Sequence, residues 1–161
     1  MKQWIDKQIH AKYTPYVLAF LIPFLVMAAV CAGHGIYPFG ENSFLHIDMY
    51  HQYAPFFMEF QRKLKAHESL MFSWNLGLGS DFVATFAYYL ASPVNWLVVF
   101  CSKQHLIEFM TVLVLLKIAC SGLFFAIYLG RHFKDNSYLV TLVSMFYALS
   151  AYISAYSWNI M

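Results

Sequence analysis

The densest group of residues that could carry out chemistry is the polar segment at positions 46–53. Its polar members are His46, Asp48, Tyr50, His51, Gln52 and Tyr53. If residues 48–52 form a helical turn, Asp48, His51 and Gln52 share one side, because residues three and four apart are neighbours on a helix. A carboxylate shielded by aromatic rings beside a bilayer can have a raised pKa and act as a base on a substrate hydroxyl. The alternative is a solvated aspartate that caps a helix.

The same segment could bind a metal ion, since His46, Asp48 and His51 are ligand types at short spacing. The pattern is weak, because the segment has no His-x-x-His or Cys-x-x-Cys pair. An oxygen-rich site that used Asp48 and a second acid such as Asp81 would favour Mg²⁺ or Mn²⁺ over zinc. A divalent cation is therefore left open as a cofactor, and no metal ligand is assigned.

Other residues could contact a ligand outside this segment. Lys117 lies inside an apolar run, where a charge is costly. It either extends along its stem to the interface or meets an anion there, and a lipid phosphate is the obvious anion. Trp74, Asn75 and Asn159 either anchor the chain at the interface or touch a sugar or head group. We therefore take Asp48 as the candidate catalytic residue, and as candidate substrate-binding residues Tyr50, His51, Gln52, Tyr53, Trp74, Asn75, Asp81, Lys117 and Asn159.

The composition places these residues in a membrane protein. The chain has 161 residues, of which 61% are hydrophobic and 11% are charged. Soluble domains have about 25% charged residues. No basic run resembles a nucleic-acid-binding patch, so we expect no nucleic-acid partner. The sequence also has no Gly-rich phosphate loop, serine nucleophile elbow or metalloprotease helix. We therefore do not expect soluble nucleotide chemistry.

Apolar runs and basic clusters predict the topology. Three lysines before Thr14 place the amino terminus in the cytoplasm by the positive-inside rule, and Arg131 and Lys134 mark a second cytoplasmic loop. The predicted order is a cytoplasmic segment 1–13, a transmembrane helix 14–33, an external loop 34–108, a second transmembrane helix 109–129, a cytoplasmic loop 130–137 and a third transmembrane helix 138–161. Because the last run ends without a closing loop, we expect the chain to be a piece of a longer protein.

The external loop is expected to carry two juxtamembrane elements. Residues 55–70 predict an amphipathic helix with phenylalanines on one face and charged residues over much of the rest, which most simply lies on the membrane surface. Residues 82–100 are apolar but contain Pro93, which removes a helix hydrogen bond and restrains the residue before it. This run is therefore predicted as two short pieces in the outer interface. The predicted fold class is an all-α polytopic membrane protein.

Four ordered strings of the sequence carry a family resemblance. They are DMYHQYAPF at 48–56, SWNLGLGSDF at 73–82, YYLASP at 88–93, and YALSAY at 147–152 with YSWN at 156–159. Together they resemble the start of the bacterial YfhO-type membrane proteins, from about Pro38 onward. Full members of that family are several times longer, which agrees with the expectation of a longer protein.

The resemblance implies a fold and an activity. It implies a GT-C-like amino-terminal module of a glycosyltransferase that takes a sugar from a polyprenyl-phosphate carrier and places it on an acceptor outside the cell. The implied acceptor is a cell-wall polymer such as lipoteichoic acid. Asp48 matches the acidic residue of the first external loop in GT-C enzymes, so by likeness it would be the general base, or would orient the acceptor or a metal. The implied location is the bacterial cell membrane, with the active side extracytoplasmic and this piece inactive alone.

Two other functions compete with the transferase. In the first, the chain is a non-catalytic transport or assembly protein whose external loop binds a partner or a membrane lipid. In the second it is a small channel, which would need polar residues in several crossings, and only Lys117 qualifies. Loss of transfer on substitution of Asp48 would separate the enzyme from both.

Overall fold

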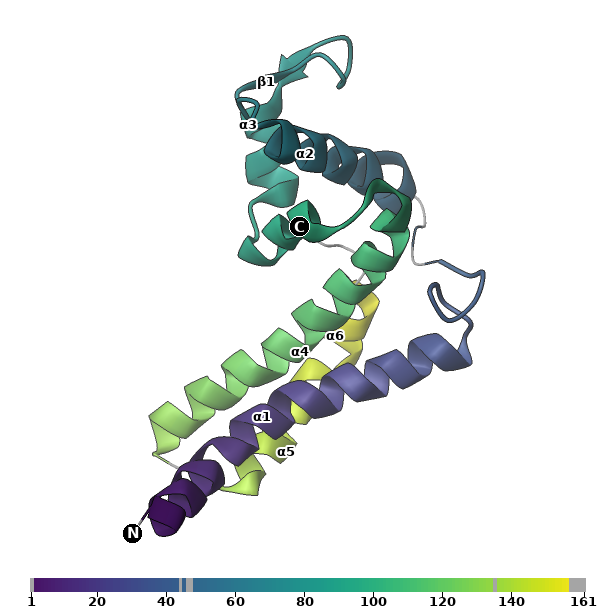
Figure 1. The fold of residues 1–161 in the computed structure, drawn as a ribbon. Coiled ribbons are helices and arrows are strands. Elements are labelled where there is room, and N and C mark those ends of the chain that lie inside the picture. Colours follow the sequence, from purple (N-terminus) through teal and green to yellow (C-terminus); the bar gives the residue numbers. More distant parts are fainter. Residues whose placement is uncertain (1, 44, 46–47, 135, 157–161) are drawn as a thin grey trace. The chain divides into compact units, whose positions relative to one another are not determined.

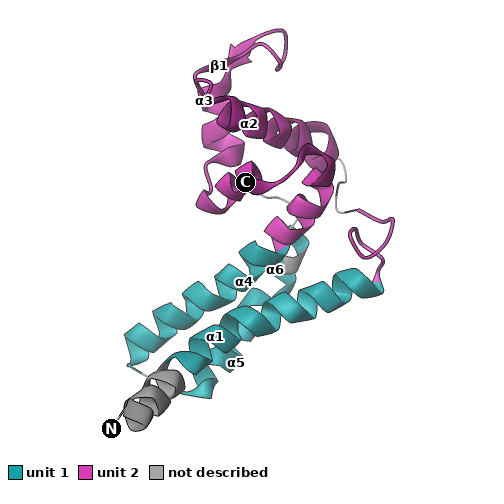
Figure 2. Ribbon diagram, in the orientation of Figure 1, with its two compact units in different colours: residues 1–33, 115–157 teal, residues 34–114, 158–161 magenta. Residues whose placement is uncertain are grey.

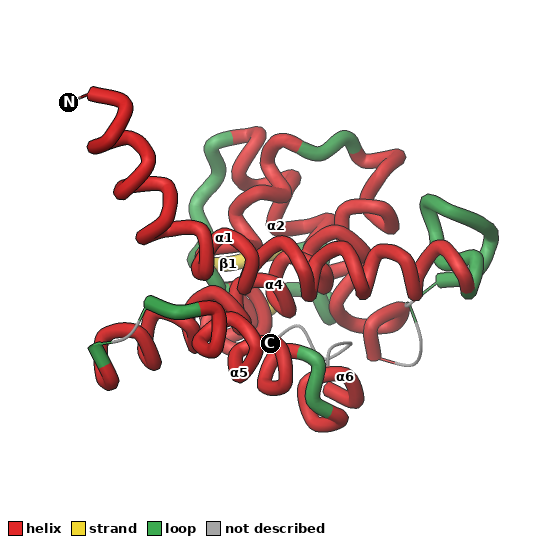
Figure 3. The backbone as a smooth tube through the Cα atoms, turned by 90° about the horizontal axis from the view of Figure 1, so that it is seen from below, coloured by secondary structure: helices red, strands yellow, loops and turns green. Residues whose placement is uncertain are grey.

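The computed structural model describes residues 2–43, 45, 48–134 and 136–156. These residues are mostly helical, and their strands are confined to one short hairpin (Figure 3). The chain divides into two compact units (Figure 2). Unit 1 comprises residues 1–33 and 115–157, and unit 2 comprises residues 34–114 and 158–161.

Unit 1 is a bundle of apolar helices. It contains α1 (Lys2–Gly33), the greater part of α4 (Leu106–Phe133), α5 (Tyr138–Ala148) and α6 (Ala151–Tyr156). In the part of the chain that the structure describes, two helical stretches are long and apolar enough to cross a membrane, Tyr13–Gly33 and Lys103–Phe133. The chain is therefore an all-α membrane protein. The run predicted as one helix over 138–161 contains a break after Ala148, and residues 157–161 lie outside the described residues.

Small residues and proline set the packing of unit 1. Pro23 has no N–H to donate to the carbonyl of Ala19, and a Cβ added at Gly122 on α4 would overlap that carbonyl oxygen. Glycine therefore lets α4 approach α1 closely, as is typical of helix pairs in membranes. Thr141 on α5 donates a hydrogen bond of 2.9 Å to the carbonyl of Pro15. Figure 1 shows α1 and α5 side by side.

Unit 2 consists of short elements around α2. In chain order these are the π-helical turn η1 (Met49–Tyr53), α2 (Ala54–Ala66), β1 (Phe72–Ser73), β2 (Ser80–Asp81), α3 (Phe82–Thr85), the π-helical turn η2 (Phe86–Leu90), and the 3₁₀ segments η3 (Pro93–Phe100) and η4 (Lys103–His105). β1 and β2 pair antiparallel. The buried core includes Met49, Phe57, Phe60, Phe82, Leu90 and Val98.

The helix α2 buries two of the charged side chains that its amphipathic pattern places opposite the phenylalanines. Pro55 lies in its first turn, and it ends at His67, whose left-handed backbone (φ 53°) returns the amide to the carbonyls of Lys63 and Leu64. Only 6% of Glu59 and 3% of Lys63 are exposed. The segment 68–75 accounts for this burial, because it supplies polar partners to both side chains. Glu59 and Lys63 thus form an internal polar contact, while Lys65 on the same helix is exposed.

The apolar run 82–100 is bent. Its two halves, Phe82–Leu90 and Pro93–Phe100, meet at an angle of 106°. Ser92 is extended (ψ 130°), as expected for the residue before a proline. The geometry is that of a broken span or a re-entrant loop.

Candidate functional site

Asp48 lies at the start of η1 and is linked by hydrogen bonds to the third motif of the sequence. The Gln52 side-chain N–H donates to Asp48 Oδ1 over a long 3.4 Å, and Gln52 Oε1 accepts from the Tyr89 hydroxyl at 3.1 Å. The two bonds fix which end of the Gln52 amide faces Asp48. Asp48 is half-buried. Its carboxylate is therefore positioned by two side chains, one of which comes from 37 residues further along the chain.

An aromatic cluster surrounds this chain of hydrogen bonds. The ring of Tyr89 contacts those of Tyr53, Phe56 and Tyr88, with centroid distances of 5.4, 4.9 and 4.7 Å. Only 2% of Tyr53 is exposed. Burial, with added effects from Tyr89, Asp48 and Tyr88, raises the pKa of the Tyr53 hydroxyl. The Tyr53 hydroxyl is thus uncharged at neutral pH, and its ring packs beside the hydrogen-bonded residues. Sequence reasoning missed Tyr89, although YYLASP was among the strings that carried the resemblance.

The exposed side of η1 borders a groove. Tyr50 and His51 are both exposed, and their rings meet edge to face at 5.2 Å. They line a groove of about 480 Å³ together with Leu45, Met58, Lys103 and Ile107, among others. We call it the Lys103 groove. A volume of this size is typical of small-ligand sites. Tyr50 and His51 lie two and three residues after Asp48 in the chain, whereas Asp48 itself does not line the groove.

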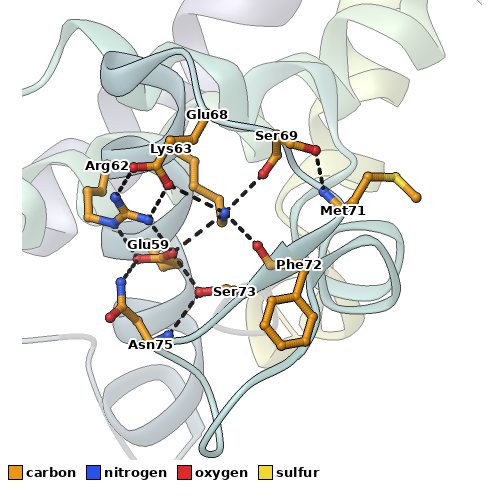
Figure 4. A network of polar contacts seen from close by, with 9 residues as sticks. All are labelled: Glu59, Arg62, Lys63, Glu68, Ser69, Met71, Phe72, Ser73 and Asn75. Atoms are coloured by element: carbon orange, nitrogen blue, oxygen red, sulfur yellow. Dashed lines mark hydrogen bonds and ion pairs between the residues drawn. The ribbon is translucent and has the colours of Figure 1, made fainter.

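A second polar cluster surrounds Glu59 on α2 (Figure 4). The Glu59 carboxylate accepts hydrogen bonds from Arg62 at 2.8 and 2.9 Å, from the Ser73 hydroxyl at 2.7 Å and from the Asn75 amide at 2.9 Å. The Arg62 hydrogen bonds, against the effect of burial, lower the pKa of Glu59 to about 2. Glu59 is therefore ionised at neutral pH, and the predicted ligand contact Asn75 has its amide committed to it.

Lys63 is buried beside Glu59 and is fully satisfied. Its ammonium donates to the carbonyl oxygens of Ser69 at 2.9 Å and Phe72 at 2.7 Å (Figure 4). The same nitrogen lies 4.0 Å from a Glu59 oxygen and 5.5 Å from the centre of the Phe82 ring. Buried charges persist when they are paired and hydrogen-bonded. We interpret the Glu59–Lys63 cluster as the contact that holds the hairpin against α2, and the sequence had suggested only a solvated charged face there.

The remaining predicted site residues are dispersed. Trp74 is 77% exposed, with its ring against Phe72. The Asp81 carboxylate accepts from the Val83 N–H at 2.8 Å, so it caps α3. Lys117 is half-buried on α4 in unit 1, whereas Asp48 belongs to unit 2. Asn159 lies outside the described residues.

The described residues offer no ready metal site. Among them, no group of three or more His, Cys, Asp and Glu side chains is placed to hold a metal ion. Asp81 is used as a helix cap, and His46 lies outside the described residues. The Mg²⁺ or Mn²⁺ site therefore stays a prediction.

Comparison with protein families matches nearly the whole chain. No curated protein and no solved structure matches it. The model of the family described as bacterial membrane protein YfhO matches residues 19–161. That range includes all four strings singled out in the sequence, from Asp48 to Asn159. The chain belongs to the YfhO family of bacterial membrane proteins.

Proposed function

We propose that this chain contributes the acceptor-activating loop of a membrane glycosyltransferase. The donor would be a sugar on a polyprenyl-phosphate carrier, and the acceptor an extracytoplasmic cell-wall polymer such as lipoteichoic acid. The observation that carries the proposal is the half-buried Asp48 carboxylate, which accepts a hydrogen bond from Gln52, itself bound by Tyr89. The residues Tyr50 and His51 of the turn that follows it line a groove of ligand size. A positioned carboxylate within reach of a bound substrate is the arrangement that general-base catalysis requires.

The chemistry proposed for Asp48 is a single displacement. The carboxylate takes the proton of the acceptor hydroxyl while the hydroxyl oxygen forms a bond to the anomeric carbon of the sugar. The bond between that carbon and the lipid phosphate oxygen breaks, and the phosphate keeps the electron pair. Attack from the face opposite the leaving group inverts the configuration at the anomeric carbon. A cation near the departing phosphate would stabilise its developing charge.

Replacement of Asp48 by asparagine tests this role. The variant keeps the size of the side chain and loses the base, so we expect transfer by the full-length protein to fall by about 10²- to 10⁴-fold. Glu41→Gln is the matched control, because it also replaces a carboxylate by an amide, at an exposed position of the same unit. Glycan transfer in membranes is the measurement, with expression and membrane insertion checked for both variants. Unchanged transfer by Asp48→Asn would overturn the assignment.

One observation favours a non-catalytic assembly or transport protein as the second candidate. The hairpin that follows α2 exposes Met71, Phe72, Trp74 and Leu78, with Leu78 97% exposed. An exposed apolar patch on a membrane protein can dock a partner or enter the lipid interface. For this function, Trp74→Ser would impair the cellular phenotype while Asp48→Asn would not. The transferase predicts that Asp48→Asn is the damaging change.

A further inference from the structure

We propose that the Lys103 groove binds the phosphate of the lipid carrier, with Lys103 and His51 as the groups that contact it. The groove is formed within unit 2 by η1, α2 and the segment that enters α4. This inference rests on the proposed function for the identity of the lipid, although binding can be measured without turnover. It assigns the role of phosphate-binding cation to Lys103, in the same unit as Asp48.

The charges around the groove favour an anion. Lys103 is exposed, and within the described part of the chain it makes no hydrogen bond or ion pair. His51 offers a ring N–H from η1, and its ring contacts only that of Tyr50 among the described aromatic pairs. Among the described residues no acid lines this groove, and Glu59, which lines the adjoining groove, is bound to Arg62. Asp48, three residues before His51, accepts a hydrogen bond from Gln52. The Lys103 ammonium is therefore left to attract an incoming phosphate.

The position of Lys103 along its helix suits a lipid phosphate. Lys103 is the first residue of the apolar stretch Lys103–Phe133, which is long enough to cross a membrane. The ends of such a stretch lie at the polar boundary of the bilayer, where lipid phosphates are found. The groove is also lined by the apolar side chains of Leu106 and Ile107, which follow Lys103 at the start of α4. A phosphate at Lys103 thus leaves its hydrocarbon tail beside apolar side chains.

A second groove adjoins the first. It has a volume of about 380 Å³, shares Pro55, Met58 and Lys103 with the Lys103 groove, and continues to Arg62 and Asn75. Lys103 therefore lines both grooves, and Arg62 is a second cation near a phosphate bound at Lys103.

The test measures binding of farnesyl phosphate, a short isoprenoid phosphate, to the purified full chain in detergent by native mass spectrometry. Farnesol, which has the same tail without the phosphate, and inorganic phosphate, which has no tail, are run in parallel. We expect farnesyl phosphate to bind at least about tenfold more tightly than either. Lys103→Gln is expected to weaken this binding about tenfold, the size of one lost charge-assisted hydrogen bond. Lys103→Arg should restore most of it.

Lys65→Gln is the matched control. Lys65 carries the same charge in the same unit, but it donates to the carbonyl of Cys101 and does not line the groove. Equal binding by Lys103→Gln and the unchanged protein overturns the groove assignment, even where Asp48→Asn abolishes transfer. Equal binding of farnesol or of inorganic phosphate also overturns it. If binding depends on Lys103 but Asp48→Asn transfers normally, the phosphate-binding role of the groove stands. The proposed catalytic role of Asp48 is then wrong.

Discussion

The Tyr89 hydroxyl donates a hydrogen bond of 3.1 Å to Gln52 Oε1. Through it, the bent apolar segment 82–100 contacts the turn that carries Asp48. The bond joins two of the strings that first suggested the family, DMYHQYAPF and YYLASP. Tyr89 is therefore a positioning residue that acts on Asp48 through Gln52. Its effect on transfer can be measured separately from its effect on stability.

Tyr89→Phe removes that hydroxyl and keeps the ring contacts. We expect the free energy of unfolding to fall by only about 1 kcal/mol, the net worth of one hydrogen bond. We expect transfer to fall more than stability, because Gln52 can then turn its amide away from Asp48. The measurement is the pH dependence of transfer alongside thermal unfolding in detergent. Tyr88→Phe is the control, since Tyr88 is 65% exposed; equal pH profiles for both variants and the unchanged protein would remove the positioning role.

Glu59→Gln is expected to be strongly destabilising. It removes the buried carboxylate that binds Arg62, Ser73 and Asn75 and lies 4.0 Å from Lys63, and removal of one partner from a buried pair costs about 3–5 kcal/mol. Thermal unfolding of the full chain in detergent measures the effect. Glu68→Gln removes a carboxylate that also pairs with Arg62 and Lys63 but is 44% exposed, so it should lower the melting temperature far less. Similar losses for the two variants would contradict the internal role of Glu59.

The Glu59 cluster also predicts an acid-sensitive stability. The pKa of the Glu59 carboxyl is about 2 in the folded chain, against an ordinary value of 4.5. The folded state therefore binds fewer protons than the unfolded state. The contribution of Glu59 to the free energy of unfolding is present above about pH 5 and is lost as the pH falls toward 2. At full size it amounts to about 3 kcal/mol. Unfolding measured from pH 7 to pH 3 should show the loss, and Glu59→Gln should flatten it.

Gly122→Val tests the close approach of α1 and α4. A side chain at this position would overlap the carbonyl oxygen of Ala19 and press on Ala148, so we expect a loss of about 1–3 kcal/mol from overpacking. Gly33→Val is the control, because a Cβ at Gly33 has no neighbour within 4 Å. Thermal unfolding in detergent compares the two. A stable Gly122→Val protein would mean that the helices can separate without cost.

Cysteine labelling from outside the cell tests the predicted topology. In a background without Cys31, Cys101 and Cys120, we expect a cysteine at 103 to react with a membrane-impermeant reagent and one at 133 not to react. These positions lie at the two ends of the apolar stretch Lys103–Phe133. The reverse pattern would mean that the bent run 82–100 crosses the membrane between Asp48 and Lys103.

The sequence by itself determined the class of protein and several local features. Two apolar stretches of sufficient length, the bend before Pro93 and the motifs from Asp48 onward depend on composition and on neighbouring residues, which are all present in the linear chain. A helix length needs only an uninterrupted apolar run, and a proline acts on the residue directly before it. These features therefore identified a YfhO-type membrane protein before any tertiary contact was known.

Only the tertiary structure decided which polar residues work together. Helical periodicity places Glu59 and Lys63 on the polar side of α2, but it cannot say that the segment 68–75 will cover them. In the same way, Asn75 binds Glu59 and Asp81 caps α3, while Tyr89 binds Gln52 and Lys103 lines a groove with His51. Partners far apart in sequence are selected by packing, and hydrogen bonds depend on distances of a few ångströms that the order of residues does not specify.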